Sequence, residues 1–214
     1  MIRKLAAALA LLVLAALAGA SAGELAVDMT RHEIDLTGAP VRGAAEPRVV
    51  LVEFIDIECP YCAAGARLTQ ELLALYPDAL QVAFRHYPIP SLHEHALDAA
   101  IAVECAGEQQ RFWEMLDRLV APDARLDAAA LAGHAAALGL DAAAYQACRT
   151  STPPAARVNA DWQAGRALDI TATPTFFLNG LRVVGLRSRS DFVALIDREL
   201  AAIAATGEAA AAMP

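Results

Sequence analysis

Residues 49–62, VVLVEFIDIECPYC, join an apolar run to a pair of cysteines and decide the fold of this chain. The run at 49–57 is almost continuously apolar, which is typical of a central strand that is buried on both faces. A helical pattern follows at 63–76, and a second strand pattern covers 80–85. Strand, helix and strand in this order predict a parallel βαβ unit, with Cys59 at the junction of the first strand and the helix.

The pair Cys59 and Cys62 allows two kinds of chemistry. A structural zinc site would need a second pair of thiolates or histidines to complete its tetrahedron, and no second C-x-x-C motif occurs. A redox pair needs its first cysteine at the N-terminus of a helix, where the helix dipole and free N–H groups lower the pKa of the thiol. Pro60 suits the first helical turn, because its missing N–H costs nothing there. We therefore favour a redox pair and expect no metal.

The rest of the chain predicts a helical block and a second α/β part. Helical periodicity covers 92–168, and strand patterns return at 173–178 and 181–184 before a final helix at 190–204. Polar and apolar residues alternate at 32–36, where we expect a short strand. We divide the chain into a signal peptide (1–22), an N-terminal segment with a short strand (23–45), a βαβ half (46–91), a helical insertion (92–170), a ββα half (171–205) and a disordered tail (206–214).

The N-terminus has the features of a cleaved secretory signal peptide. Arg3 and Lys4 precede an apolar run at 5–18, and Ala20-x-Ala22 supplies the cleavage pattern. The apolar run is shorter than the roughly 20 residues that a membrane-spanning helix needs. We expect cleavage after Ala22 and export to the periplasm, an oxidising compartment in which disulfides persist.

The composition excludes two broad classes of protein. Hydrophobic residues make up 57% of the 214 residues and the mean hydropathy is +0.39, which excludes a largely disordered chain. The net charge is -8, so the chain lacks the excess of cations that binds nucleic-acid phosphates. We expect a globular protein that does not bind nucleic acid.

Taken together, these motifs resemble the thioredoxin superfamily, and more closely the DsbA-like thiol-disulfide oxidoreductases of the bacterial envelope. The resemblance spans about residues 32–204 and implies a thioredoxin fold with an inserted helical domain. The motifs that carry it are Val52-Glu53-Phe54, Cys59-Pro60-Tyr61-Cys62, Arg85-His86-Tyr87-Pro88, Cys105-Ala-Gly, Phe112-Trp113-Glu114-Met115 and the run from Thr173 to Gly180.

The resemblance implies roles for individual residues. Cys59 matches the nucleophilic cysteine and Cys62 the buried resolving cysteine. Pro174 matches a proline that follows a cis peptide bond, which would lay the backbone of Thr173 beside Cys59 to pair with an extended substrate. Glu53 stands six residues before Cys59 where the family keeps an acidic residue; buried there, it would exchange a proton with Cys62, whereas the alternative is a side chain that faces solvent.

The dipeptide between the cysteines, Pro60 and Tyr61, is expected to contact substrate. The most oxidising relatives have Pro-His at these positions, and a histidine supplies positive charge near the thiolate. Tyr61 supplies no such charge, so it weakens the expectation of a strong oxidant.

The other two cysteines, Cys105 and Cys148, lie on inward helical stripes of the predicted insertion; the stripe of Cys105 also carries Leu97 and Ile101. In an exported protein we expect them to form a structural disulfide. The alternative is two buried free thiols that pack as small apolar side chains.

These expectations combine into a periplasmic protein-disulfide oxidoreductase that acts as a thiol oxidase on cysteine-containing proteins. No bound cofactor is needed, and the resemblance implies recycling by a membrane quinone-linked thiol oxidase. Only about 25 residues separate Ala22 from the first strong strand, too few for the dimerisation domain of isomerase-type relatives, so we expect a monomer. A dithiol reductase or isomerase is one alternative. A copper chaperone that uses Cys59 and Cys62 as ligands is another.

Overall fold

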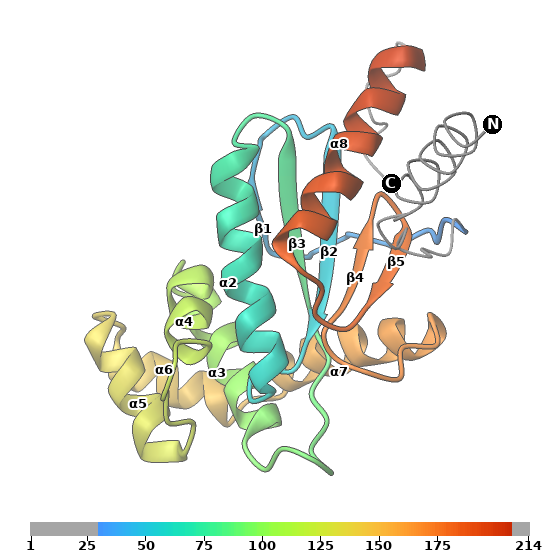
Figure 1. Cartoon of the computed structure of the whole chain (residues 1–214). Helices are drawn as coiled ribbons and strands as arrows, with labels where there is room; N and C mark the ends of the chain where they lie inside the picture. The colour runs from blue at the N-terminus through green and yellow to red at the C-terminus, as the bar shows by residue number, and fades with distance from the viewer. Residues whose placement is uncertain (1–29, 207–214) are drawn as a thin grey trace, which may run out of the picture.

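A five-stranded mixed sheet forms the centre of the protein in the computed structural model, which describes residues 30–206 (Figure 1). The strand order is β1 (Val41–Gly43), β3 (Leu80–His86), β2 (Val49–Ile55), β4 (Thr175–Leu178) and β5 (Leu181–Val184). Strands β2 and β3 are parallel and the other neighbouring pairs are antiparallel. The predicted leader and residues 207–214 of the predicted tail lie outside the described residues.

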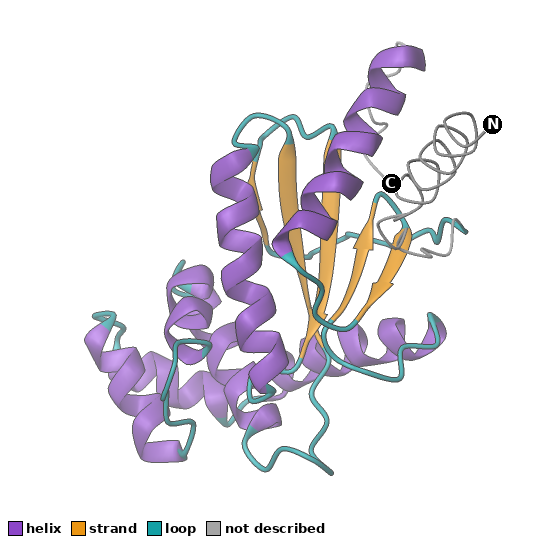
Figure 2. Ribbon diagram, viewed as in Figure 1, coloured by secondary structure: helices purple, strands orange, loops and turns teal. Residues whose placement is uncertain are grey.

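Helices cover both faces of this sheet, as the continuous apolar run of β2 predicts (Figure 2). All seven residues of β2 are buried. On one face, β2 packs against α2 (Pro60–Leu75) and α8 (Arg189–Thr206). On the other face it packs against the N-terminal segment and the region of α7 (Thr152–Ala167). Because side chains alternate along a strand, Glu53 lies on the face covered by α2.

Five helices form the insertion between β3 and β4. They are α3 (Ala96–Gly107), α4 (Phe112–Leu119), α5 (Ala128–Ala137), α6 (Ala142–Arg149) and α7. Asp127 and Asp141 cap α5 and α6 by accepting hydrogen bonds from backbone N–H groups in the first turn. The core of the insertion also contains Ile55, Cys59 and Cys62, so the cysteine pair lies where the two parts of the chain share one apolar cluster.

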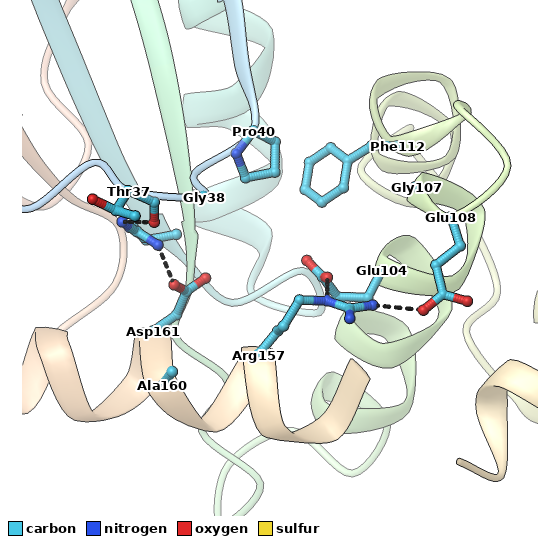
Figure 3. A pocket seen from close by; sticks show the side chains of 11 residues that line it. Thr37, Gly38, Pro40, Glu104, Gly107, Glu108, Phe112, Arg157, Ala160 and Asp161 are labelled. Atoms are coloured by element: carbon cyan, nitrogen blue, oxygen red, sulfur yellow. Dashed lines mark hydrogen bonds and ion pairs between the residues drawn. The ribbon is translucent and has the colours of Figure 1, made fainter. Parts of the chain in front are cut away.

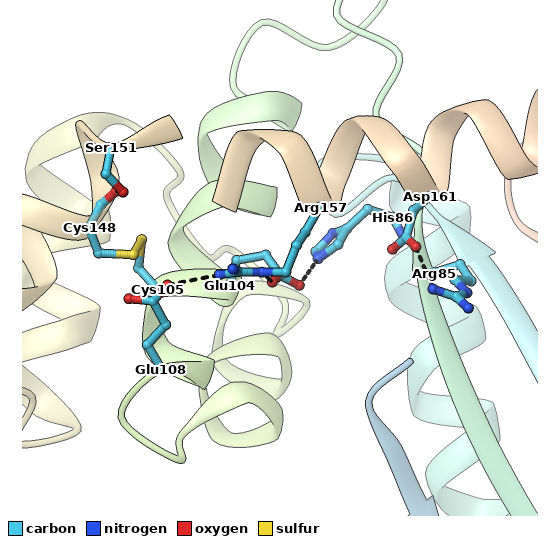
Figure 4. Close-up of polar contacts among 9 residues, drawn as sticks. All are labelled: Arg85, His86, Glu104, Cys105, Glu108, Cys148, Ser151, Arg157 and Asp161. Atoms are coloured by element: carbon cyan, nitrogen blue, oxygen red, sulfur yellow. Dashed lines mark hydrogen bonds and ion pairs between the residues drawn. A yellow bond between two sulfur atoms is a disulfide. The ribbon is translucent and has the colours of Figure 1, made fainter. Parts of the chain in front are cut away.

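Polar contacts fasten the insertion to the end of β3 (Figure 4). On α7, Asp161 accepts a hydrogen bond from the backbone N–H of His86 at 3.0 Å and pairs with Arg85 at 2.7 Å. On α3, Glu104 lies 3.0 Å from Nε2 of His86 and pairs with Arg157 of α7. These contacts hold α3 and α7 at a fixed position beside the sheet.

A disulfide joins Cys105 of α3 to Cys148 of α6 inside the insertion (Figure 4). Cys105 is fully buried, as its helical stripe predicts. Leu97, the first member of that stripe, is instead exposed, next to the exposed Asp98.

The strand predicted at 32–36 is wrong. The backbone there is irregular apart from a single bridge between Arg31 and Leu181, and the first strand is β1. The alternating pattern has another cause: Ile34 and Leu36 pack into the core on the α7 side of the sheet without pairing as a strand. Element boundaries also differ, since α2 already begins at Pro60, β4 begins only at Thr175 and Thr206 still belongs to α8.

Removing the disulfide should lower stability without affecting Cys59. The double substitution Cys105→Ala and Cys148→Ala opens a loop with a sequence separation of 43 residues. The chain-entropy account puts the loss at about 3–4 kcal/mol. Urea unfolding measures the loss, and thiol exchange by the folded variant should stay close to the wild-type rate. A folded variant that has lost exchange would contradict a purely structural role.

Helix α7 approaches the sheet so closely that Gly165 leaves no room for a side chain. A Cβ there would lie 2.6 Å from two ring carbons of Tyr87, whose ring is held by a 2.7 Å hydrogen bond to the carbonyl of Ile170. Gly165→Ala should therefore lower the free energy of unfolding by about 1–3 kcal/mol. The matched control is Gly133→Ala on α5, where a Cβ meets nothing within 4 Å; it should raise the same quantity by about 0.5–1 kcal/mol. Equal effects of both substitutions in urea would contradict this packing.

Candidate active site

Cys59 lies at the N-cap of α2, directly after the buried strand β2. Pro60 occupies the first helical turn, so the free backbone N–H groups of that turn come from Tyr61 and Cys62. Both cysteines are free thiols, which is the dithiol state of the pair. The strand, the junction and the helix therefore place Cys59 where the sequence predicts a stabilised thiolate.

The pKa of Cys59 is lowered to about 5. A hydrogen bond from the Cys62 thiol contributes most; partial burial opposes the shift, and the backbone N–H groups of Cys62 and Tyr61 support it. At neutral pH the reduced pair therefore carries a negative charge on Cys59.

Cys62 has the opposite environment. Its side chain is fully buried, and burial, followed by the hydrogen bond and the charge of Cys59, raises the pKa of its thiol far above the usual range. The backbone N–H of Asp56 donates to its Sγ at 3.4 Å. Cys59 is itself only 6% exposed, so the two cysteines differ chiefly in acidity, as a nucleophile and a resolving thiol must.

The other predicted substrate-binding residues surround Cys59. The peptide bond between Thr173 and Pro174 is cis, and the Cys59 thiol donates to the carbonyl oxygen of Thr173 at 3.8 Å. Pro60 is exposed, and Tyr61 is 69% exposed. The structure therefore brings both predicted segments together at one edge of the sheet.

Glu53 is fully buried and does not face solvent. Neither of its carboxylate oxygens has a hydrogen-bond partner among the described residues. Burial raises the pKa of Glu53 to about 7, although the positive charge of Arg42 opposes the rise. On the same face of β2, its neighbour Ile55 packs in the cluster that contains Cys62. Near neutral pH this carboxyl group can hold or release a proton on the face of β2 that packs toward the cluster containing Cys62.

Arg42 was missed by the sequence reasoning. It comes from β1, pairs with Asp117 of α4 at 2.9 Å and lies 4.2 Å above the ring of Trp113. Its Nε and Nη2 atoms are buried without a partner among the described residues. No local pattern marks this arginine, because β1 reaches the site only through its pairing with β3.

Asp56 and His93 were also missed. Asp56 is fully buried at the end of the apolar run, and its Oδ2 accepts hydrogen bonds from the backbone N–H of Ile89 at 2.7 Å and from Nδ1 of His93 at 2.9 Å. The sequence did contain a signal for Asp56, because an aspartate in an apolar run indicates a buried carboxylate with a specific partner. Its partner could not be read from the sequence, since His93 follows 37 residues later.

A cavity of about 520 Å³ opens on another part of the molecule (Figure 3). None of the predicted site residues lines it. Its charged side chains already have partners, since Arg157 pairs with Glu104 and Glu108, and Asp161 pairs with Arg85. No group of three or more potential metal ligands occurs within residues 30–206. In the same residues, no helix combines the length and apolarity needed to cross a membrane.

A thioredoxin-type sheet with a cysteine pair at the N-terminus of a helix defines the class of thiol-disulfide oxidoreductases. The model of the thioredoxin family matches residues 36–198, about three quarters of the chain, and the chain belongs to this family.

Solved structures of other proteins, including the following two, share the fold. A thioredoxin-like oxidoreductase from Silicibacter pomeroyi has a TM-score of 0.68 and 27% identity, over 75% of this chain and 91% of that one. Alpha-DsbA1 of Wolbachia pipientis has a TM-score of 0.72 and 20% identity, over 82% of this chain and 97% of that one. The protein therefore has the fold of DsbA-like thiol-disulfide oxidoreductases.

A curated relative is named Na(+)/H(+) antiporter NhaA 1, from Salinispora arenicola. It is 38% identical over 142 residues, which are 66% of this chain but only 22% of the antiporter. The chain thus spans about a fifth of the length of this relative, and the transport in its name belongs to the whole antiporter.

The low pKa of Cys59 should depend on the buried thiol of Cys62. Cys62→Ala removes the hydrogen bond that contributes most and should raise the pKa of Cys59 by about one unit. Cys62→Ser keeps an O–H donor and should shift it less. Thiolate absorbance at 240 nm measures the titration, and Cys59→Ser should abolish the low-pH transition. Identical titrations of the alanine and serine variants would refute this dependence.

Burial of Glu53 should make stability depend on pH. Its pKa rises from 4.5 to about 7 on folding, so its contribution is fully present below pH 4.5 and is lost as pH rises through 7. In Glu53→Gln the free energy of unfolding should no longer fall over this pH range. Thiol exchange that needs a proton at Cys62 should become slower at neutral pH. Urea unfolding at pH 5 and pH 8 measures the difference, with the exposed Glu33→Gln as control. If both variants keep the wild-type pH dependence, Glu53 ionises as an ordinary surface carboxylate.

Proposed function

We propose that the protein is a periplasmic thiol oxidase that transfers the Cys59–Cys62 disulfide to cysteine-containing proteins. The observation that carries this proposal is the unequal pair of thiols. A pKa of about 5 at Cys59 stabilises the reduced state as a thiolate, and a stabilised reduced state makes the disulfide a stronger oxidant.

The reaction has two exchange steps. A substrate thiolate attacks Sγ of Cys59, a mixed disulfide forms, and Cys62 leaves with the two electrons of the broken bond. Because the pKa of Cys62 is raised, its thiolate takes up a proton, for which the carboxyl group of Glu53 is the donor. A second substrate thiolate then attacks the substrate sulfur, and Cys59 leaves as a stabilised thiolate.

The segments around Cys59 account for binding of protein substrates. The Thr173 backbone lies beside Sγ of Cys59, so an extended chain can hydrogen-bond there while its cysteine reaches the sulfur. The exposed ring of Tyr61 offers apolar contact area to the same chain. The reduced pair would be reoxidised by a membrane quinone-linked thiol oxidase, and the protein would act as a monomer.

Two observations support the periplasmic location. Residues 1–22 have the basic start, apolar run and small-residue pattern that are typical of a secretory leader, and the Cys105–Cys148 disulfide suits an oxidising compartment.

The direction of exchange is tested in two ways. The protein is equilibrated with glutathione, and it is added to the refolding of a reduced substrate protein whose native state contains disulfides. An oxidase should have a reduction potential above that of glutathione and should speed oxidative refolding. Cys62→Ser should trap mixed disulfides, whereas Cys59→Ser should be inactive. A potential below that of glutathione, with efficient reduction of substrate disulfides, would instead assign a reductase. Tight stoichiometric Cu(I) binding without exchange would assign a copper chaperone.

A further inference from the structure

Three hydrogen bonds hold the connection between β3 and α3 against the active-site loop. Asp56 accepts the backbone N–H of Ile89 and Nδ1 of His93 on its Oδ2. Glu58 accepts the backbone N–H of His95 on its Oε2 at 2.6 Å. A segment that starts 30 residues after Cys59 in sequence, at Ile89, is thereby fixed against the loop that carries Asp56 and Glu58.

Asp56 holds the ring of His93 in one orientation. The carboxylate is fully buried, and its second oxygen accepts the backbone N–H of Glu58 at 2.9 Å. The ring of His93 is only about one-fifth exposed, and its Nδ1 is committed to Asp56. A histidine that donates Nδ1–H to a carboxylate has its tautomer and its charge set by that partner.

The ring faces negative groups. Partial burial lowers the pKa of His93, but the hydrogen bond and charge of Asp56, together with the charges of Cys59 and Glu58, outweigh burial and raise it. The charge of Cys59 acts on His93, so a protonated His93 must act on Cys59 in return, because the coupling of two sites is reciprocal.

We propose that His93, held by Asp56, supplies the positive charge that stabilises the Cys59 thiolate, in place of the histidine that Tyr61 replaces between the cysteines. His93 is a positioning residue, because it acts on the reacting sulfur through its charge. The inference rests on thiol exchange at Cys59 but not on the direction of that exchange.

Substitutions at His93 separate its charge from its hydrogen bond. His93→Asn keeps an N–H donor for Asp56 and removes the charge, whereas His93→Arg restores a permanent cation. His134→Asn is the matched control, because His134 lies on α5 and contacts the carbonyl of Arg125 instead.

Thiolate absorbance and equilibrium with glutathione give the readouts. His93→Asn should raise the pKa of Cys59 by up to about half a unit, less than Cys62→Ala does, and make the disulfide up to about 3-fold less oxidising. His93→Arg and His134→Asn should remain near wild type. An unchanged pKa in folded His93→Asn, or the same shift in His93→Arg, would overturn the proposal.

A measurement on the wild-type protein removes any dependence on folding of the variants. The pKa of the His93 ring, followed by NMR, should be higher in the reduced protein than in the disulfide form, because oxidation removes the negative charge of Cys59. Equal values in the two states would overturn the proposal. The titrations of Cys59 and of His93 give the same result whether the protein is an oxidase or a reductase. Failure of the refolding assay alone would therefore refute only the proposed direction of thiol exchange.

Discussion

Burial of β2 on both faces is the constraint on which the rest of the structure depends. Seven consecutive buried residues need a helical layer on each side, and α2 supplies part of one layer by running directly from the end of the strand. The turn between them puts Cys59 at a helix N-terminus and Cys62 one turn deeper, inside the core. The hydrogen bond that Cys62 donates to Cys59 lowers the pKa of Cys59, and burial raises the pKa of Cys62; the N–H groups of the first helical turn add to this difference.

Sheet topology brings the remaining groups to the same edge. Because β3 is parallel to β2, the connection that follows β3 leaves at the end where Cys59 lies, and it carries His93. Because β4 is antiparallel to β2, the segment that precedes β4 arrives at that end too, and it carries Thr173. A thiolate, a histidine held by a carboxylate and a substrate-pairing backbone therefore meet without any local sequence signal joining them.

The sequence was sufficient wherever a strong local pattern coincided with its tertiary environment. The apolar run of β2, the strand patterns at 173–178 and 181–184 and the helical periodicity of the insertion all led to elements that the structure contains. The pattern failed at 32–36, where alternation reflects packing of Ile34 and Leu36 on the core and not pairing with a strand. Alternation reports which side chains are buried, and it does not report whether the backbone has a partner.

The sequence by itself determined the α/β class, the interrupted order of elements and the cysteine pair at a strand-to-helix junction, since these follow from periodicity and spacing within short windows. Only the tertiary structure decided that Glu53 is buried without a hydrogen-bond partner among the described residues, that Arg42 lies on the same face of the sheet, and that Asp56 holds the ring of His93. The physical reason is that the pKa of a side chain depends on solvation and on charges a few ångströms away. Those neighbours come from segments that only the folded chain brings together.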